Sequence, residues 1–115
     1  MIGIDIVSID RISKLVARHG DKALLRFLSH REIELSGRNI STIAGFWSAK
    51  EAGAKAIGTG IGSVCGFKDI KLDKTKAGQP TIKYKKKLRK KFSINSSNLS
   101  ITHDGGFAIA VVVYV

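Results

Sequence analysis

The feature that most constrains the fold is a pair of apolar segments at the C-terminal end of the chain. Residues 99–103 and 107–115 flank Asp104-Gly105-Gly106, a sequence typical of a tight turn between two antiparallel strands. The second segment is apolar at every position, so we expect a central strand that is covered on both faces. Residues 2–9 alternate and are rich in β-branched side chains, which predicts a further strand.

The segments between these strands predict mainly helices. Asn39 and Gly58 are residue types that begin and end helices, and they bracket the longest one, predicted over residues 40–57. The other predictions are a helix over 11–19 capped by Asp10, helices over 21–28 and from 29 or 30 to 36, a strand over 67–72, a short strand ending at 83 and an amphipathic helix over 84–92.

The length and composition are those of one globular domain. The chain has 115 residues, of which 43% are apolar and 25% are charged. We therefore expect a single domain over residues 1–115, of the α+β class, with helices packed on a small, largely antiparallel sheet.

The chain is strongly basic, with twenty Lys and Arg residues against nine Asp and Glu residues. Eleven basic and two acidic residues fall within residues 68–91, so a polyanionic partner is expected, and a nucleic-acid-binding module is the main alternative to an enzyme. However, Tyr84 and Phe92 share the apolar seam of the predicted helix rather than lying among its lysines, as stacking on bases would require. A solvated helix face is therefore preferred, without a nucleic-acid partner, and the thin seam argues against a membrane.

Two further features concern the compartment. Cys65 is the only cysteine, so the fold needs no disulfide, and no apolar run approaches the roughly 20 residues that span a bilayer. Asp5 interrupts the N-terminal apolar stretch, which argues against a signal peptide. A cytoplasmic protein is expected.

Three polar residues occupy positions where apolar ones are expected. Asp5 lies in the first predicted strand, and Glu51 lies on the apolar stripe of the longest helix. The simpler interpretation of Asp5 is a structural ion pair or a helix-cap acceptor. The simpler one of Glu51 is an exposed pair with Lys55, but the stripe argues against it because it turns Glu51 toward the core. If the two carboxylates converge, they provide hard oxygen ligands for a cation such as Mg²⁺. His103 ends a strand just before the turn, where a lone histidine is more often structural.

The glycine-rich segment Gly58-Thr59-Gly60-Ile61-Gly62 has two interpretations. It is neither a dinucleotide-binding fingerprint nor a P-loop, and it follows a helix instead of preceding one. A flexible connector is favoured. Phosphate binding there would need exposed backbone N–H groups and nearby lysines.

Four motifs, in order, resemble those of the holo-acyl-carrier-protein synthases. They are the start Gly3-Ile4-Asp5 with Arg11-Ile12, the central Trp47-Ser48-Ala49-Lys50-Glu51-Ala52 with Lys55-Ala56 and Gly58-Thr59-Gly60, the turn Gly78-Gln79-Pro80, and Ser100-Ile101-Thr102-His103. The resemblance spans nearly the whole chain and implies the 4′-phosphopantetheinyl transferase fold. It departs from the family at Phe46, where arginine is usual, and at His30-Arg31.

The resemblance implies an enzyme of fatty acid biosynthesis. Such enzymes transfer the 4′-phosphopantetheine arm of coenzyme A to a serine of the apo acyl carrier protein and release adenosine 3′,5′-bisphosphate. Asp5 and Glu51 match the Mg²⁺ ligands. Glu51, directly or through a metal-bound water, would accept the serine proton, and Lys55 would stabilise phosphate charge or protonate the leaving group. The expected coenzyme A-binding residues are Lys50, Lys55, Gly58, Thr59, Gly60, Gly62, Pro80 and His103.

The resemblance also implies partners. The acidic carrier protein would meet the basic helix face formed by Arg11, Lys14 and Arg18. Similar proteins form homotrimers with active sites at subunit interfaces. We therefore expect Asp5 and Glu51 of one chain to face the docking helix of its neighbour.

Overall fold

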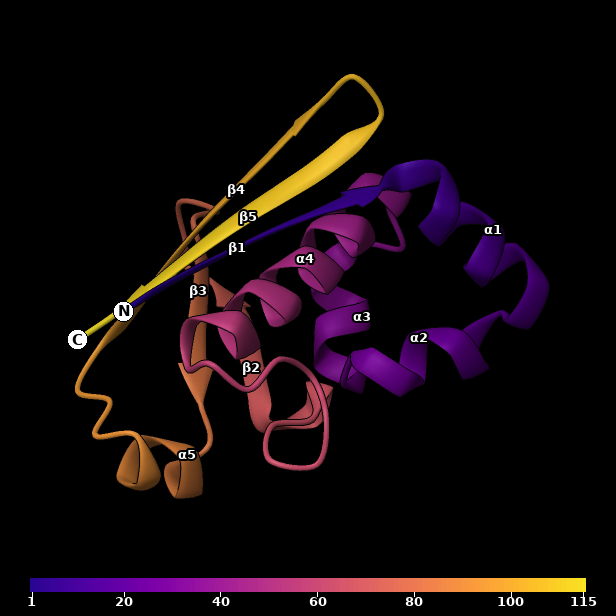
Figure 1. Ribbon diagram of the computed structural model, residues 1–115. Coiled ribbons are helices and arrows are strands. Elements are labelled where there is room, and N and C mark those ends of the chain that lie inside the picture. Colours follow the sequence, from indigo (N-terminus) through magenta and orange to yellow (C-terminus); the bar gives the residue numbers. More distant parts are fainter.

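The computed structural model describes all 115 residues, and Figure 1 shows the helices on one side of a three-stranded sheet. Along the chain the elements are β1 (Ile2–Ser8), α1 (Ile9–His19), α2 (Asp21–Phe27), α3 (His30–Ser36), α4 (Ile40–Ala56), the 3-10 helix η1 (Phe67–Asp69), β2 (Ile70–Lys74), β3 (Pro80–Tyr84), α5 (Lys86–Lys91), β4 (Ser97–Asp104) and β5 (Phe107–Tyr114). The predicted α+β class is confirmed.

The larger sheet has the order β1-β5-β4, and all its strands are antiparallel. β5 is therefore the central strand, as its apolar sequence predicts. The register sets Asp5 of β1 opposite Ala110 and His103 of β4 opposite Ala108. A separate hairpin is formed by β2 and β3, in which Leu72 pairs with Ile82.

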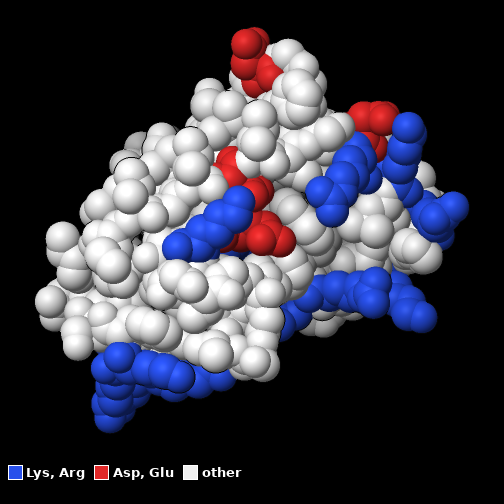
Figure 2. Space-filling view, viewed as in Figure 1, with Lys and Arg blue, Asp and Glu red and all other residues white.

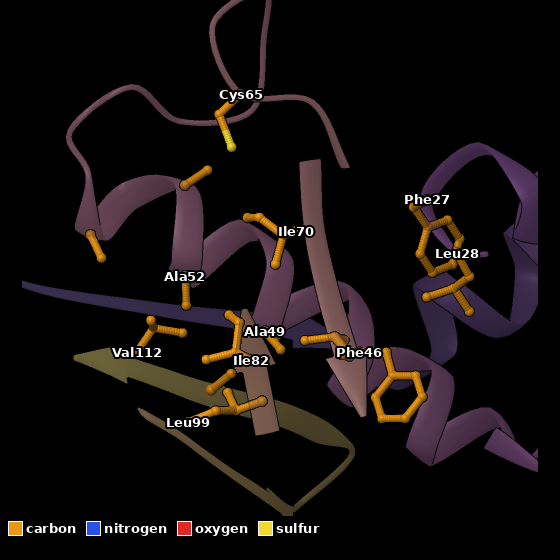
Figure 3. Packing of buried hydrophobic residues seen from close by; sticks show 14 of the residues in the cluster. Phe27, Leu28, Phe46, Ala49, Ala52, Cys65, Ile70, Ile82, Leu99 and Val112 are labelled. Carbon is orange, nitrogen blue, oxygen red and sulfur yellow. The ribbon is translucent and has the colours of Figure 1, made fainter. Parts of the chain in front are cut away.

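Helix α4 lies against one face of the larger sheet because small residues line the contact. A Cβ atom on Gly3 would lie 2.0 Å from the carbonyl oxygen of Ala52, so β1 and α4 meet almost backbone to backbone. Figure 3 shows the core built around this helix, with apolar side chains from the sheet, the β2–β3 hairpin and α2 converging on it: Phe27, Leu28, Phe46, Ala49, Ala52, Cys65, Ile70, Ile82, Leu99 and Val112.

The expected cover on both faces of β5 is wrong for the single chain. Ala108, Ala110 and Val112 face α4 and are fully buried, whereas the alternate side chains are not. Ile4 is 60% exposed, and it belongs to an apolar set on the uncovered face of the sheet that also contains Ile2, Ile6, Phe107 and Val113. The strand is apolar on both faces, but this chain covers only one.

Three predicted boundaries also need correction. Ser8, not Asp10, caps α1, because its hydroxyl accepts a hydrogen bond from the amide of Arg11. Residues 67–69 form a 3-10 turn before β2, held by the hydrogen bond from the Gly66 amide to the Asp69 carboxylate. Tyr84 belongs to β3 and not to the last helix, since its hydroxyl donates to the carbonyl of Gly53 in the core. None of the helices is long and apolar enough to cross a bilayer.

Candidate active site

Asp5 and Lys55 form an ion pair where β1 crosses the second half of α4. The Asp5 carboxylate and the Lys55 Nζ atom are 3.0 Å apart, with the Asp5 side chain 12% exposed and that of Lys55 50% exposed. Asp5 faces the helix because side chains alternate along the strand, and its neighbours on that face, Gly3 and Val7, are buried against α4. In Figure 2, acidic and basic side chains gather near the middle of the face shown, over β1 and α4.

Glu51 lies beside this pair, as the sequence predicts. Partial burial raises the pKa of the Glu51 carboxyl above its ordinary value, and the nearby charge of Asp5 raises this pKa further. The positive charges of Lys55 and Arg11 lower the pKa of Glu51. Arg11 also sits over the ring of Trp47, with its guanidinium carbon 5.7 Å from the ring centroid. Two acids and two cations of one chain thus form a charged cluster.

This cluster fits a hard divalent cation that is also held by substrate. Mg²⁺ is commonly bound by one or two carboxylates, with water and substrate phosphates completing its coordination. Asp5 and Glu51 supply two such carboxylates. Their negative charges repel each other, which helps to raise the pKa of Glu51, and a cation between them would relieve this repulsion. No group of three or more His, Cys, Asp or Glu side chains could hold a metal without substrate.

The glycine-rich segment closes the end of α4. The amides of Thr59 and Gly60 both donate to the carbonyl of Ala54, and the amide of Gly58 donates to that of Lys55. Gly58 and Gly60 have φ values of 85° and 63°, a conformation that favours glycine. The Gly62 amide donates to the carbonyl of Cys65. These four N–H groups are therefore paired in this conformation, three of them with carbonyls at the end of α4. Binding of coenzyme A by Gly58, Thr59, Gly60 and Gly62 stays a prediction.

Lys50, which is predicted to bind coenzyme A, is buried away from the charged cluster. Its side chain is 1% exposed, and its Nζ atom lies 2.7 Å from the carboxylate of Glu32 in α3. Adjacent residues on a helix point about 100° apart, so Lys50 faces α3 while Glu51 faces β1. Glu32 is not among the residues that the sequence singled out. Its signal was the capping box Ser29-His30-Arg31-Glu32, in which Ser29 and Glu32 bond each other's amides.

His103 and Pro80 lie away from the charged cluster. The Nε2 atom of His103 is 2.8 Å from the carbonyl oxygen of Ser41, at the start of α4. Glu51 is about 15 Å further along the axis of the same helix. Pro80 begins β3 and pairs with Lys74 in the separate hairpin. The single chain therefore does not bring the expected coenzyme A-binding residues together.

The predicted docking residues line a groove of about 1150 Å³ between α1, α2 and the side of α4. Arg11, Lys14 and Arg18 lie along α1, and Arg26 adds a cation from α2. The groove contains Arg11, which is also part of the charged cluster of Asp5 and Glu51. The chain's own α1 thus lies beside the cluster, and contact of Asp5 and Glu51 with the docking helix of a neighbouring chain stays a prediction.

Sequence reasoning missed the aromatic floor of this groove. Phe27, Trp47 and Phe67 come from three different elements, and the ring centroids of Trp47 lie 5.0 Å from those of both Phe27 and Phe67. The sequence predicts Phe67 in a strand, and nothing in the spacing of these residues shows that they meet.

Comparisons with known proteins agree with this architecture. Residues 1–112 match the model of the 4′-phosphopantetheinyl transferase superfamily. The holo-[acyl-carrier-protein] synthase of Aliarcobacter butzleri is 61% identical over 115 residues, which cover 100% of this chain and 97% of that protein. The corresponding enzyme of Sulfurimonas denitrificans is 54% identical over 112 residues, covering 97% and 92%.

Solved structures give the same result. The crystal structure of the Helicobacter pylori holo-[acyl-carrier-protein] synthase in complex with coenzyme A has a TM-score of 0.97 and 51% identity, covering 100% of both chains. The Bacillus anthracis synthase in complex with CoA (3′,5′-ADP) has a TM-score of 0.82 and 34% identity, covering 98% of this chain and 93% of that one. The chain described here therefore belongs to the 4′-phosphopantetheinyl transferase superfamily.

Proposed function

We propose that this protein transfers the 4′-phosphopantetheine arm of coenzyme A to a serine of the apo acyl carrier protein. The serine oxygen attacks the phosphorus that carries the pantetheine arm. The bond from that phosphorus to the bridging oxygen breaks, and adenosine 3′,5′-bisphosphate leaves. The observation that carries the proposal is the convergence of Asp5, Glu51 and Lys55 in a chain 61% identical to a holo-[acyl-carrier-protein] synthase.

Each member of the cluster has a role in this reaction. Glu51 accepts the serine proton, directly or through a water, as a positioned carboxylate base. The Lys55 ammonium group stabilises the charge that develops on the phosphates, or donates a proton to the leaving group. Asp5 orients Lys55 through their ion pair.

Asp5 and Glu51 would also hold Mg²⁺ when coenzyme A is bound. The ion would neutralise pyrophosphate charge during phosphoryl transfer. Lys55, which pairs with Asp5 in this structure, would contact the same phosphates.

We propose a homotrimer in which two chains complete each site. His103 and Pro80 of one chain would meet the charged cluster of its neighbour, which accounts for their separation within a single chain. The uncovered apolar face of the sheet supports this assembly, since Ile4 and Ile6 are about 60% exposed and a heterologous ring contact would bury them.

The groove between α1 and α2 is proposed to dock the carrier protein. Its rim of Arg11, Lys14, Arg18 and Arg26 would attract an acidic helix, and its aromatic floor would pack against apolar side chains of that helix. Arg11 belongs both to the groove and to the cluster of Glu51, so a serine on the docked carrier would lie near the base.

The reaction is tested with coenzyme A, Mg²⁺ and an apo acyl carrier protein, followed by mass spectrometry of the carrier. The wild-type protein should add one phosphopantetheine arm, whereas Glu51→Gln should not. Glu34→Gln, a change of the same type on the exposed face of α3, is the matched control and should retain the activity. No mass gain with several carrier proteins would refute the enzyme assignment.

The assembly has a separate test. Glu51→Gln and His103→Ala chains should each be inactive alone, because each lacks one half of the site. Mixed trimers, formed by unfolding and refolding the two chains together, should regain part of the activity at sites that combine two intact halves. A monomeric mass by light scattering, or verified mixed trimers without activity, would contradict the proposal.

A further inference from the structure

A second cavity, of about 490 Å³, lies between the first turn of α3 and the outer face of the β2–β3 hairpin. It shares no lining residue with the docking groove and contains none of Asp5, Glu51 and Lys55. Its wall is formed by the side chains of the hairpin that point away from the core, because Ile70, Leu72 and Ile82 occupy the alternate, buried positions.

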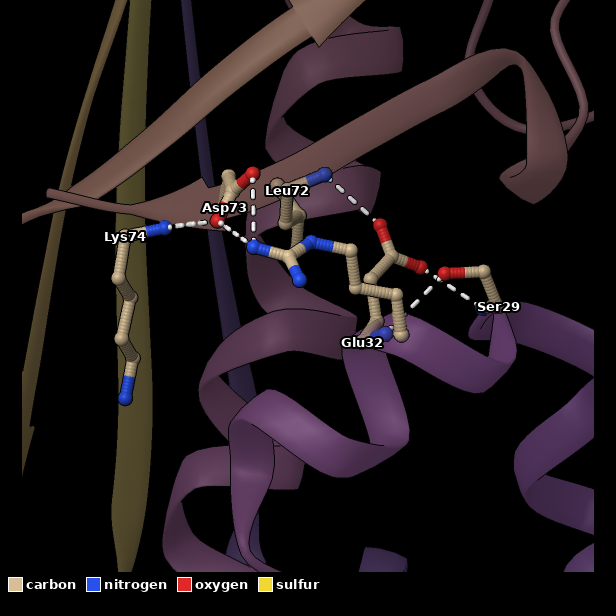
Figure 4. A network of polar contacts seen from close by, with 6 residues as sticks. Ser29, Glu32, Leu72, Asp73 and Lys74 are labelled. Atoms are coloured by element: carbon tan, nitrogen blue, oxygen red, sulfur yellow. Dashed lines mark hydrogen bonds and ion pairs between the residues drawn. The ribbon is translucent and has the colours of Figure 1, made fainter.

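The acidic groups of this cavity are fully used. Figure 4 shows how the Glu32 carboxylate accepts hydrogen bonds from the amides of Ser29 and Leu72. The same carboxylate also accepts from Lys50. Asp73 accepts from the amide of Lys74 and from the guanidinium of Arg31 (Figure 4). Neither carboxylate is left to balance another cation.

Three lysines of the cavity have no acidic partner. Lys68 donates one hydrogen bond to the carbonyl of Leu28, and neither Lys71 nor Lys83 makes an ion pair. The hairpin register places Lys71 directly opposite Lys83 on the same face. Like charges at directly opposed positions destabilise a strand pair. A local arrangement that costs stability without compensation is typical of a binding site.

The cavity floor adds a buried cation. The Lys50 ammonium group is buried against a single carboxylate, and the nearby charge of Lys68 disfavours its protonated form. Together the cavity contains five cationic and two acidic side chains, an excess of three positive charges. The hydroxyl of Thr81 also lines it and is a further donor.

We propose that this cavity binds a small anion with two linked phosphate groups. A phosphate monoester carries about −1.5 to −2 charges at neutral pH, so a second phosphate is needed to balance the excess of three. Lys71 and Lys83 would hold the anion from the hairpin, and Lys68 would hold it from the opposite wall. The cavity lies outside the proposed active site, so its ligand would be an additional one and not the transferred substrate.

The test is isothermal titration of the full chain with pyrophosphate, in EDTA and without coenzyme A. We expect saturable binding at one site per chain. Lys71→Gln and Lys83→Gln should each weaken binding about three- to fivefold, as expected for one partly exposed ion pair, and the double variant should weaken it further. Lys86→Gln and Lys90→Gln on α5 are matched controls, since both lysines are exposed, unpaired and outside the cavity. Both controls should change the affinity less than twofold.

A parallel titration with adenosine diphosphate identifies the source of the anion. Equal affinity for both compounds indicates recognition of the diphosphate alone, and tighter binding of the nucleotide indicates a nucleotide ligand; both outcomes support the site. Equal losses in the α5 controls, or unchanged binding in the double variant, would overturn it. Tighter binding of a short RNA through the same lysines would also overturn it, because the basic face would then be a nucleic-acid surface.

Discussion

The buried ion pair between Glu32 and Lys50 provides the sharpest test of the packing described here. Both side chains are almost fully buried, at 3% and 1% exposed, with 2.7 Å between the carboxylate and Nζ. Glu32→Gln keeps the shape of the side chain but leaves the Lys50 charge without a partner. Removing one member of a buried ion pair costs about 3–5 kcal/mol. Whole domains are stable by only about 5–15 kcal/mol, so this one change should remove a large share of the total.

The reverse change should cost less. In Lys50→Met the Glu32 carboxylate loses one partner but keeps its hydrogen bonds from the amides of Ser29 and Leu72. The expected loss is about 1–3 kcal/mol, the usual cost of removing one partner from a buried polar group. In the double variant no buried charge remains unpaired. Its loss should therefore be smaller than the sum of the two single losses by at least about 2 kcal/mol.

Urea unfolding at constant chain concentration measures these differences, with the single tryptophan, Trp47, as the fluorescence probe. Glu34→Gln, on the exposed side of the same helix, is the control and should change stability by less than about 0.5 kcal/mol. If Glu32→Gln does not fold, a double variant that does fold still shows the coupling, because adding Lys50→Met has then restored stability. A loss in the double variant equal to the sum of the two single losses would show that the pair is not coupled.

Three further predictions concern the charged cluster and the groove. Asp5→Asn should abolish transfer while far-UV circular dichroism remains that of the wild type, whereas Asp10→Asn, on exposed α1, should retain it. Arg11→Glu should lower kcat/KM for the carrier protein, and the defect should shrink as salt rises, because a rim charge acts mainly on encounter; an unchanged kcat/KM would exclude Arg11 from docking. Burial raises the pKa of Glu51, so its ionisation costs folding stability as pH rises above the unfolded value. In EDTA, Glu51→Gln should thus be more stable than the wild type at pH 7 but not at about pH 4, and equal stability at both values would contradict the raised pKa.

The sequence predicted the position of β5 in the sheet but not what covers it. An apolar residue at every position indicates burial on both faces. Such a pattern does not distinguish cover by the same chain from cover by another copy. Ala108 and Ala110 meet α4, whereas Phe107 and Val113 remain more than 40% exposed. Phe107 and Val113 stay exposed because all the helices lie on the other side of the sheet (Figure 1).

The sequence also located only part of the candidate site. Glu51 and Asp5 broke apolar patterns, and the structure places them together. Lys50 is adjacent to Glu51 in the sequence, yet the rotation of one helical position directs it to Glu32. Gly58 correctly indicated the end of α4, but the amides of Thr59 and Gly60 were already needed by the carbonyl of Ala54. Sequence spacing shows which face a residue occupies but not which hydrogen bonds it has left.

The spacing of Gly3 and Asp5 explains how the cluster is positioned. Residues two apart on a strand share a face, so both point toward α4. Because Gly3 has no side chain, β1 approaches the backbone of Ala52 more closely than any other residue would allow. This approach brings Asp5 within 3.0 Å of Lys55, less than one turn further along the helix. An alanine at position 3 would push the strand away from the helix and separate the ion pair first, since it lies on the same face. The glycine thus acts on the chemistry through distance alone, without touching any charged group.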